Sequence, residues 1–184
     1  RDSNISVGIG ESGERDRMAE LAGLLESVVD QGVVVICAAG NKGPGEGTLS
    51  PLGESRRVIT VGCNEGGYFG ARKDLCENYS GRGRCDLSYR KPDIVAPGTD
   101  VMSCNGGCYR DRRGRWRDAY IRKSGTSMAT PIVSGAAALF LQKFPYASSE
   151  QVKRRMIFTA RDMGEDGSRQ GWGMLDIEKM CSFY

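Results

Sequence analysis

The sequence predicts an α/β fold in which a parallel sheet lies between helices on both of its faces, giving three layers. Residues 33–37 form a continuous apolar run rich in β-branched side chains, typical of a strand buried on both faces of a parallel sheet. A helical pattern at 14–31 separates this run from a short apolar run at 5–9. Strand, helix and strand in this order indicate a right-handed crossover. The length of 184 residues suits a single core, so we expect one domain over residues 1–184.

The remaining elements follow in chain order. The run at 5–9 ends at glycines and predicts a strand, and the helix at 14–31 ends before Gly32, a plausible C-cap residue. Further buried strands are expected at 58–61 and 94–95.

Two long segments, 64–90 and 103–118, read as loops rich in glycine and charged residues. Within the second, residues 110–117 hold five arginines and look like the tip of a hairpin. We weigh two interpretations of this tip. It is a solvated hairpin end, or it is a basic wall on the leaving-group side of a site, because it leads into residues 123–127.

The most apolar helix of the chain is expected at 126–144. Apolar residues surround nearly its whole circumference, which predicts a central buried helix with Pro131 in its first turns. A helix with a capping box formed by Ser148 and Gln151 follows, and a short terminal helix begins at Asp176.

Composition excludes several classes of function. The net charge of +3 does not favour nucleic-acid binding, and no stretch approaches 18 uncharged apolar residues, so no membrane span is expected. We expect no bound metal and no cofactor. Asp93 and Asp100 have no histidine to orient and are interpreted as structural, because the chain contains no histidine at all.

Seven cysteines are an odd number for a disulfide framework. Cys37 and Cys63 lie at the ends of apolar runs and are interpreted as buried free thiols. Four others lie in charged loops, where free thiols are favoured over a disulfide or a zinc site: Cys76, Cys85, Cys104 and Cys108. This pattern leaves the compartment open but leans toward a reducing, cytoplasmic one.

Two polar side chains occupy positions suited to acyl transfer. Ser127 opens the apolar helix, where unpaired N–H groups and the helix dipole favour an anion. Asn41 directly follows a buried strand, where its amide is able to donate to an oxyanion. Each has a plainer alternative, because serine is a common N-cap residue and asparagine is common in turns.

Several segments in a fixed order resemble the subtilisin-like serine proteases. They are GTSMATP at 125–131, NISVG at 4–8, GVVVICAAGN at 32–41, VITVG at 58–62 and KPDIVAPG at 91–98. The resemblance implies a subtilisin-like fold, Ser127 as catalytic nucleophile and Asn41 as catalytic oxyanion donor, with the Ser127 N–H as second donor. It assigns substrate binding to Ser6, Val7, Gly8, Ala38, Ala39, Gly40, Ser124, Gly125 and Thr126.

The chain also departs from the family pattern. The segments that carry the family's catalytic aspartate and histidine normally precede those found here, and neither is present. The chain therefore resembles the C-terminal part of a catalytic domain that lacks its N-terminal part. Calcium in the full-length parent stays open.

We accordingly expect a serine endopeptidase as the full-length parent, acting on a peptide or protein substrate. The isolated chain is expected to be inactive and to self-associate through the edge near residues 5–8. Two alternatives remain: a non-catalytic pseudoprotease that binds peptides, or one chain of a two-chain protease. Ser127 and Asn41 argue against a pseudoprotease, which has no evident need to keep both.

Overall fold

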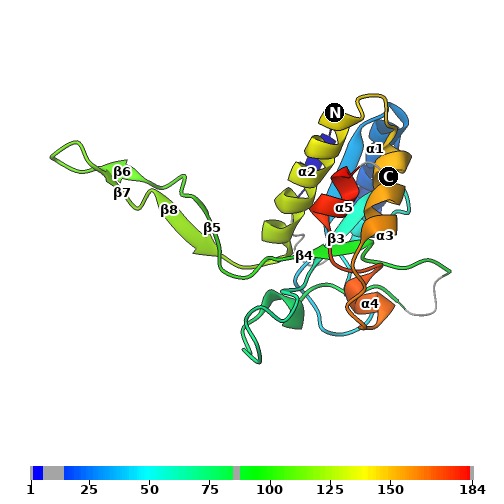
Figure 1. The fold of residues 1–184 in the computed structure, drawn as a ribbon, viewed down its shortest axis with the longest axis horizontal. Helices are drawn as coiled ribbons and strands as arrows, with labels where there is room; N and C mark the ends of the chain where they lie inside the picture. The colour runs from blue at the N-terminus through cyan, green and yellow to red at the C-terminus, as the bar shows by residue number, and fades with distance from the viewer. Residues whose placement is uncertain (1, 6–14, 85–87, 183–184) are drawn as a thin grey trace.

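A parallel sheet forms the centre of the computed structural model, which describes residues 2–5, 15–84 and 88–182. Its four strands are β1 (Asp2–Ile5), β2 (Val34–Ala38), β3 (Ile59–Cys63) and β4 (Ile94–Ala96), in the order β1-β2-β3-β4 (Figure 1). The register places Ile36 beside both Asn4 and Ile59, and Val61 beside Ile94. The first strand begins three residues earlier than the sequence predicts, and residues 6–9 lie outside the described part of the chain.

Side chains of β2 alternate between two hydrophobic clusters on opposite faces of the sheet. Val34 and Ile36 face the larger cluster, whereas Val35 and Cys37 face the smaller one. All four are buried, which explains why the strand reads as a continuous apolar run.

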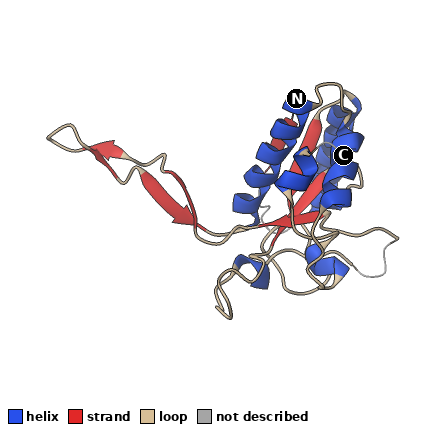
Figure 2. Cartoon of the chain, viewed as in Figure 1, coloured by secondary structure: helices blue, strands red, loops and turns tan. Residues whose placement is uncertain are grey.

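Helices cover both faces, so the three-layer α/β prediction is confirmed (Figure 2). Helix α1 (Arg15–Asp30) and the 3-10 helix η1 (Pro51–Glu54) supply Leu25, Val29 and Leu52 to the smaller cluster. The larger cluster is completed by three helices: α2 (Thr126–Lys143), α3 (Ser149–Thr159) and α5 (Ile177–Cys181). None of the helices within the described ranges is long and apolar enough to span a bilayer.

Helix α2 is buried along one face only, which corrects the expectation of a helix covered all round. Ala129, Val133 and Phe140 lie in the larger cluster. The opposite stripe, formed by Pro131, Gly135, Ala138 and Leu139, is exposed in the described structure, and Leu139 keeps 51% of its accessible surface. This stripe is apolar and follows helical spacing, as expected of a face that packs against another element.

The shorter elements lie at the periphery. Helix α3 has the expected capping box, in which Ser148 Oγ accepts from Gln151 N and Gln151 Oε1 accepts from Ser148 N. The 3-10 helix η2 (Cys76–Asn78) follows β3, and the short helix α4 (Gly167–Gln170) is capped by Asp166. Asp176 caps α5 as expected.

A long hairpin, which we call the arm (residues 101–123), projects from the body (Figure 1). Strands β5 (Val101–Cys104) and β8 (Tyr120–Lys123) pair antiparallel at its base, and β6 (Tyr109–Arg110) pairs with β7 (Trp116–Arg117) near its end. The predicted hairpin is therefore confirmed. The interpretation of its arginine tip as a basic wall beside the site is wrong. The tip lies at the end of the arm that is remote from the body and from the start of α2 (Figure 1).

A buried ion cluster fixes the segment that leads into β4. Lys91 Nζ lies 2.7 Å from Asp93 Oδ2, and Lys153 Nζ lies 2.8 Å from Asp93 Oδ1. Lys91 also donates to Val58 O and Thr60 Oγ1, while Thr60 N donates to Asp93 Oδ2. Burial lowers the pKa of Lys91 to about 8, although Asp93 opposes the shift. The structural role expected for Asp93 is thus confirmed.

We predict that Asp93→Ala destabilises the chain by about 3–5 kcal/mol, because it leaves two ammonium groups without their shared carboxylate. Glu150→Ala is the control, since the Glu150–Arg154 pair is exposed and its loss should cost less than about 1 kcal/mol. Urea unfolding followed by circular dichroism measures both. Equal losses in the two variants would contradict a structural role for the cluster.

Candidate active site

The predicted nucleophile lies where β8 passes into α2. The strand ends at Lys123, Gly125 is the N-cap residue, and Ser127 is the second residue of the helix. Ser127 is half-buried, and neither its backbone N–H nor its hydroxyl has a hydrogen-bond partner among the described residues. A free N–H in the first turn is what the start of a helix leaves available to an anion.

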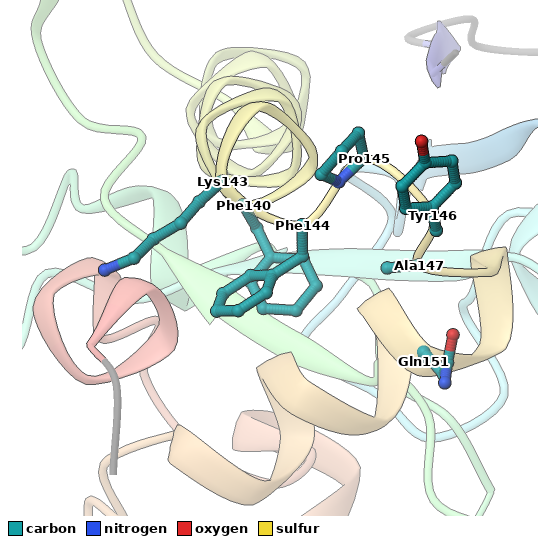
Figure 3. A pocket seen from close by; sticks show the side chains of 7 residues that line it. All are labelled: Phe140, Lys143, Phe144, Pro145, Tyr146, Ala147 and Gln151. Carbon is teal, nitrogen blue, oxygen red and sulfur yellow. The ribbon is translucent and has the colours of Figure 1, made fainter.

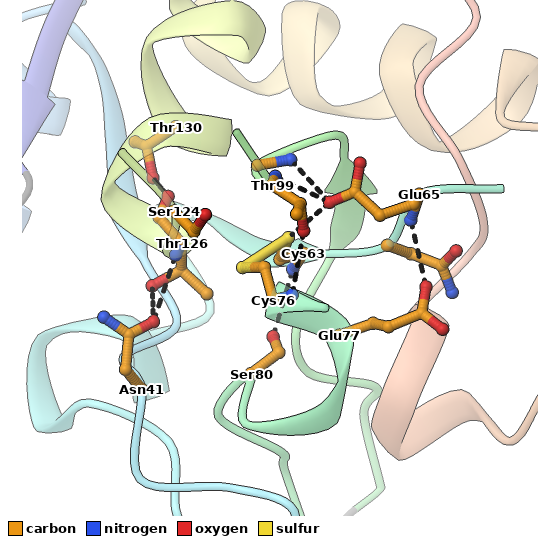
Figure 4. The surroundings of a disulfide bond; sticks show 12 residues. Asn41, Cys63, Glu65, Cys76, Glu77, Ser80, Thr99, Ser124, Thr126 and Thr130 are labelled. Atoms are coloured by element: carbon orange, nitrogen blue, oxygen red, sulfur yellow. Dashed lines mark hydrogen bonds between the residues drawn. A yellow bond between two sulfur atoms is a disulfide. The ribbon is translucent and has the colours of Figure 1, made fainter. Parts of the chain in front are cut away.

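Asn41 reaches across from the end of β2 to the start of α2. Its Oδ1 accepts hydrogen bonds from Thr126 N at 3.0 Å and from Thr126 Oγ1 at 3.1 Å (Figure 4). Gly40 N donates to the same hydroxyl at 3.2 Å. Gly125 has no side chain to cap the helix, so Asn41 supplies the cap from another element.

These bonds fix the orientation of the Asn41 amide. With Oδ1 held by Thr126, no described residue accepts a hydrogen bond from Nδ2 (Figure 4). The amide nitrogen is thus an unused donor beside Gly125, two residues before Ser127. An oxyanion hole needs a preorganised donor of this kind.

Gly125 is required for this close approach. Its φ of 145° lies in a region that L side chains rarely adopt. A Cβ built on Gly125 would also lie 3.3 Å from Asn41 Nδ2. A larger residue at this position would therefore both strain the backbone and press on the amide nitrogen.

The residues assigned to substrate binding are only partly brought together. Ala38 and Ala39 are buried, and Gly40 is partly exposed beside Thr126. Ser124 Oγ accepts from Asp100 N at 3.0 Å, which ties the end of β8 to the turn after β4. Ser6, Val7 and Gly8 lie outside the described residues, so the opposing wall of the cleft stays a prediction.

A disulfide joins Cys63, at the end of β3, to Cys76 in η2 (Figure 4). The predictions of free thiols at Cys63 and at Cys76 are therefore wrong, and a zinc site that uses Cys76 is excluded with them. Cys37 is a free buried thiol as expected, and burial raises its pKa to about 11. Cys104 is free and exposed. No group of three metal-binding side chains occurs within the described ranges.

The disulfide lies beneath the segment that supports Gly125. Gly125 N donates to Gly98 O at 2.9 Å. A Cβ on Gly98 would lie 2.8 Å from Cys63 Sγ and 2.7 Å from Gly125 O, so only glycine fits there. Gly98 therefore contacts the start of α2 on one side and packs closely against Cys63 on the other.

Sequence reasoning missed Glu65, a buried carboxylate in the same support. Its Oε1 accepts from Gly98 N at 3.0 Å and from Thr99 N at 2.7 Å (Figure 4). Thr99 Oγ1 in turn accepts from Cys76 N. The available signal was a carboxylate two residues beyond a buried strand, followed by two glycines.

A hollow of about 430 Å³ lies at the other end of α2 (Figure 3). Phe140, Phe144 and Tyr146 give it an apolar lining, and Lys143 and Gln151 lie at its rim. Phe140 follows Ser127 by 13 residues along the helix, a distance of about 20 Å. This hollow is thus separate from the predicted site.

Comparison with known proteins agrees with the geometry. Residues 3–173 match the model of the subtilase family, and the chain belongs to that family. It is 36% identical over 160 residues to serine protease AprX of Bacillus subtilis, covering 84% of this chain and 36% of AprX. It is 31% identical over 180 residues to subtilisin DY of Bacillus licheniformis, covering 95% of this chain and 54% of that protein.

The solved structures give the same result. The prenylagaramide maturation protease PagA superposes with a TM-score of 0.67 at 27% identity, over 97% of this chain and 61% of PagA. The chain spans about a third to a half of the length of the curated relatives named above.

The expectation of a cytoplasmic compartment is wrong. A relative from Serratia marcescens, 37% identical over 98 residues, is named an extracellular serine protease. The match covers 46% of this chain and 9% of that protein. The Cys63–Cys76 disulfide also disagrees with a reducing compartment, since disulfides persist mainly in oxidising ones.

We predict that Cys76→Ser lowers the free energy of unfolding by about 3 kcal/mol, because the bond closes a loop with a sequence separation of 13. Cys104→Ser is the control, since Cys104 is exposed and unpaired. Denaturant unfolding gives the stabilities, and peptide mapping without reductant identifies the bond. Alkylation of both Cys63 and Cys76 in unreduced, denatured protein would contradict the pairing.

Proposed function

We propose that this chain provides the nucleophile and the oxyanion hole of a subtilisin-like serine endopeptidase. The observation that carries the proposal is the Asn41–Thr126 contact, which holds the Asn41 amide beside Gly125 with its Nδ2 unused as a donor. Membership of the subtilase family supports the reaction class.

The proposed mechanism is acyl transfer. Ser127 Oγ attacks the carbonyl carbon of a peptide bond while its proton passes to a base. The resulting oxyanion accepts from Asn41 Nδ2 and Ser127 N. The C–N bond then breaks, and the leaving amine takes the proton. Water next attacks the acyl-enzyme while the base takes its proton. The C–O bond to Ser127 then breaks, and Ser127 Oγ takes the proton back.

The base and its orienting carboxylate are proposed to come from outside these 184 residues, because the chain contains no histidine. Two surfaces suit the element that would bring them. One is the apolar stripe of α2 around Gly135 and Leu139, and the other is the outer edge of β1, which pairs with no strand in the described part of the chain. We propose that one further part of the domain, on the same polypeptide or on another, covers both.

The proposed binding cleft is bounded by the ends of β2 and β8. Residues 38–40 and 124–126 would contact the substrate on either side of the scissile bond, and Ser6–Gly8 would pair with its backbone. Support comes from the partial exposure of Gly40 beside Thr126.

Labelling with a fluorophosphonate tests the proposal. In the endogenous protein that contains this chain, the probe should modify Ser127, and Ser127→Ala should abolish labelling. The isolated 184-residue chain should show neither labelling nor peptide hydrolysis, because it has no base. Absence of labelling in the endogenous protein would instead favour a pseudoprotease, and labelling at another residue would sink the assignment of Ser127.

We further predict that Asn41→Ala in the endogenous protein lowers kcat by about 10²–10³-fold and leaves KM nearly unchanged. Asn78→Ala is a matched control, because the Asn78 amide only donates to Lys73 O on the exposed surface. Steady-state kinetics with a peptide substrate measures both, and a thermal melt checks that α2 stays formed without its cap. A rise in KM at constant kcat would make Asn41 a binding residue.

A further inference from the structure

The arm carries the whole positive excess of the chain. Residues 101–123 hold seven basic and two acidic residues, a net charge of +5, whereas the full chain has +3. The other 161 residues therefore have a net charge of −2. A concentration of one sign of charge on a projecting element steers and binds partners of the opposite sign.

Part of this charge holds the arm together. The Arg110 guanidinium lies over the Trp116 ring, 4.8 Å from its centroid. Arg117 pairs with Asp111 at 2.9 Å, and Asp111 Oδ1 also accepts from the backbone N–H groups of Arg113 and Arg115. The turn at the tip is thus built before any partner binds.

Three other arginines of the arm are available to a partner. The side chains of Arg112, Arg113 and Arg115 are exposed around the turn, and no acidic group in the described structure pairs with them. Three guanidinium groups on a preformed turn present forked donors, which suit carboxylates.

Apolar side chains along the arm are also exposed. Met102, Tyr109, Trp116 and Tyr120 keep 56%, 55%, 58% and 67% of their accessible surface. A two-stranded ribbon alone is marginally stable in water. Aromatic residues beside arginines are the composition that dominates binding energy at protein interfaces.

The arm's position relates it to the proposed site. Its base leads through Ser124 to Ser127, and its tip lies ten residues before Lys123, at Arg113. At about 3.3 Å per residue the ribbon spans about 33 Å. An extended substrate needs about ten residues to cover the same distance, so the arginines lie beyond the reach of a short peptide.

We propose that the arm is an exosite that binds an acidic segment of a protein substrate, about eight to ten residues to the leaving-group side of the scissile bond. This proposal rests on the proposed endopeptidase function for its direction along the substrate. Carboxylates of the segment pair with Arg112, Arg113 and Arg115, and its apolar residues pack on Trp116 and Tyr120. Because the arm ends at Lys123, four positions before Ser127, a partner bound on the arm lies on the segment that leads to the site.

Kinetics with paired peptides tests the exosite in the endogenous protein. A 25-residue peptide with Asp and Glu at the eighth to tenth positions after the cleaved bond is compared with one that has Ser there. An eight-residue peptide with the same cleavage sequence is the third substrate. We expect kcat/KM to be about tenfold higher for the acidic peptide at low salt, and the preference to fade in 0.5 M NaCl.

Two triple variants separate local from general charge effects. Substituting Arg112, Arg113 and Arg115 by Ser should bring the acidic preference close to one without changing hydrolysis of the eight-residue peptide. Substituting Arg57, Lys73 and Arg154 by Ser removes the same charge from exposed positions elsewhere and should keep the preference. An equal preference in both variants would overturn the exosite.

Fluorescence anisotropy with the acidic 25-residue peptide gives a readout that does not depend on catalysis. Binding that requires the arm arginines, without any hydrolysis, would support the exosite while rejecting the proposed function. No binding would overturn the exosite alone. Tighter binding to phosphatidylserine vesicles or to duplex DNA, or a dimer in light scattering that the arm variant loses, would overturn it in favour of that partner.

Discussion

The hydrogen bonds between the Asn41 amide oxygen and Thr126 connect the two halves of the candidate site. One partner follows β2 and the other begins α2, and the two are 85 positions apart in the sequence. The contact caps the helix, orients the amide and fixes the distance between Asn41 and Ser127 in one arrangement. Catalytic geometry of this kind depends on groups that are held before the substrate arrives.

The site is supported from below by a second set of contacts. Glu65 holds Gly98 and Thr99, Cys63 lies under Gly98, and Gly98 accepts from Gly125. Each contact occurs where a strand of the sheet has just ended. The parallel sheet thus brings residues from distant parts of the sequence to one edge.

Much of this organisation was predictable because it depends on local patterns. The alternation of Val34 to Cys37 between two cores required a strand buried on both faces, and the apolar α2 required a sheet to cover. Ser127 and Asn41 were found from motifs at element ends. The Cys63–Cys76 bond and the Glu65 contacts were not found, because each joins segments whose approach depends on the path of a glycine-rich loop.

The exposed stripe of α2 shows a different reason for failure. The apolar composition of the helix predicted burial on every side. The side chains are apolar all round as predicted, but the described elements cover only one face of the helix. The direction of the arm was equally unpredictable from the sequence, because no sequence pattern in a two-stranded ribbon specifies the angle at which it leaves the body.

Asn41 and Gly125 have structural roles, so their presence in a chain is not by itself a sign that catalytic activity has been retained. Asn41 caps α2, and Gly125 gives its amide room, so selection for folding alone would preserve both after catalysis had been lost. A pseudoprotease of this fold would therefore still need Asn41 to cap α2. Among the described contacts the Ser127 hydroxyl has no structural role. In related chains, replacement of this serine would therefore mark the loss of activity more clearly than any other change in the segment.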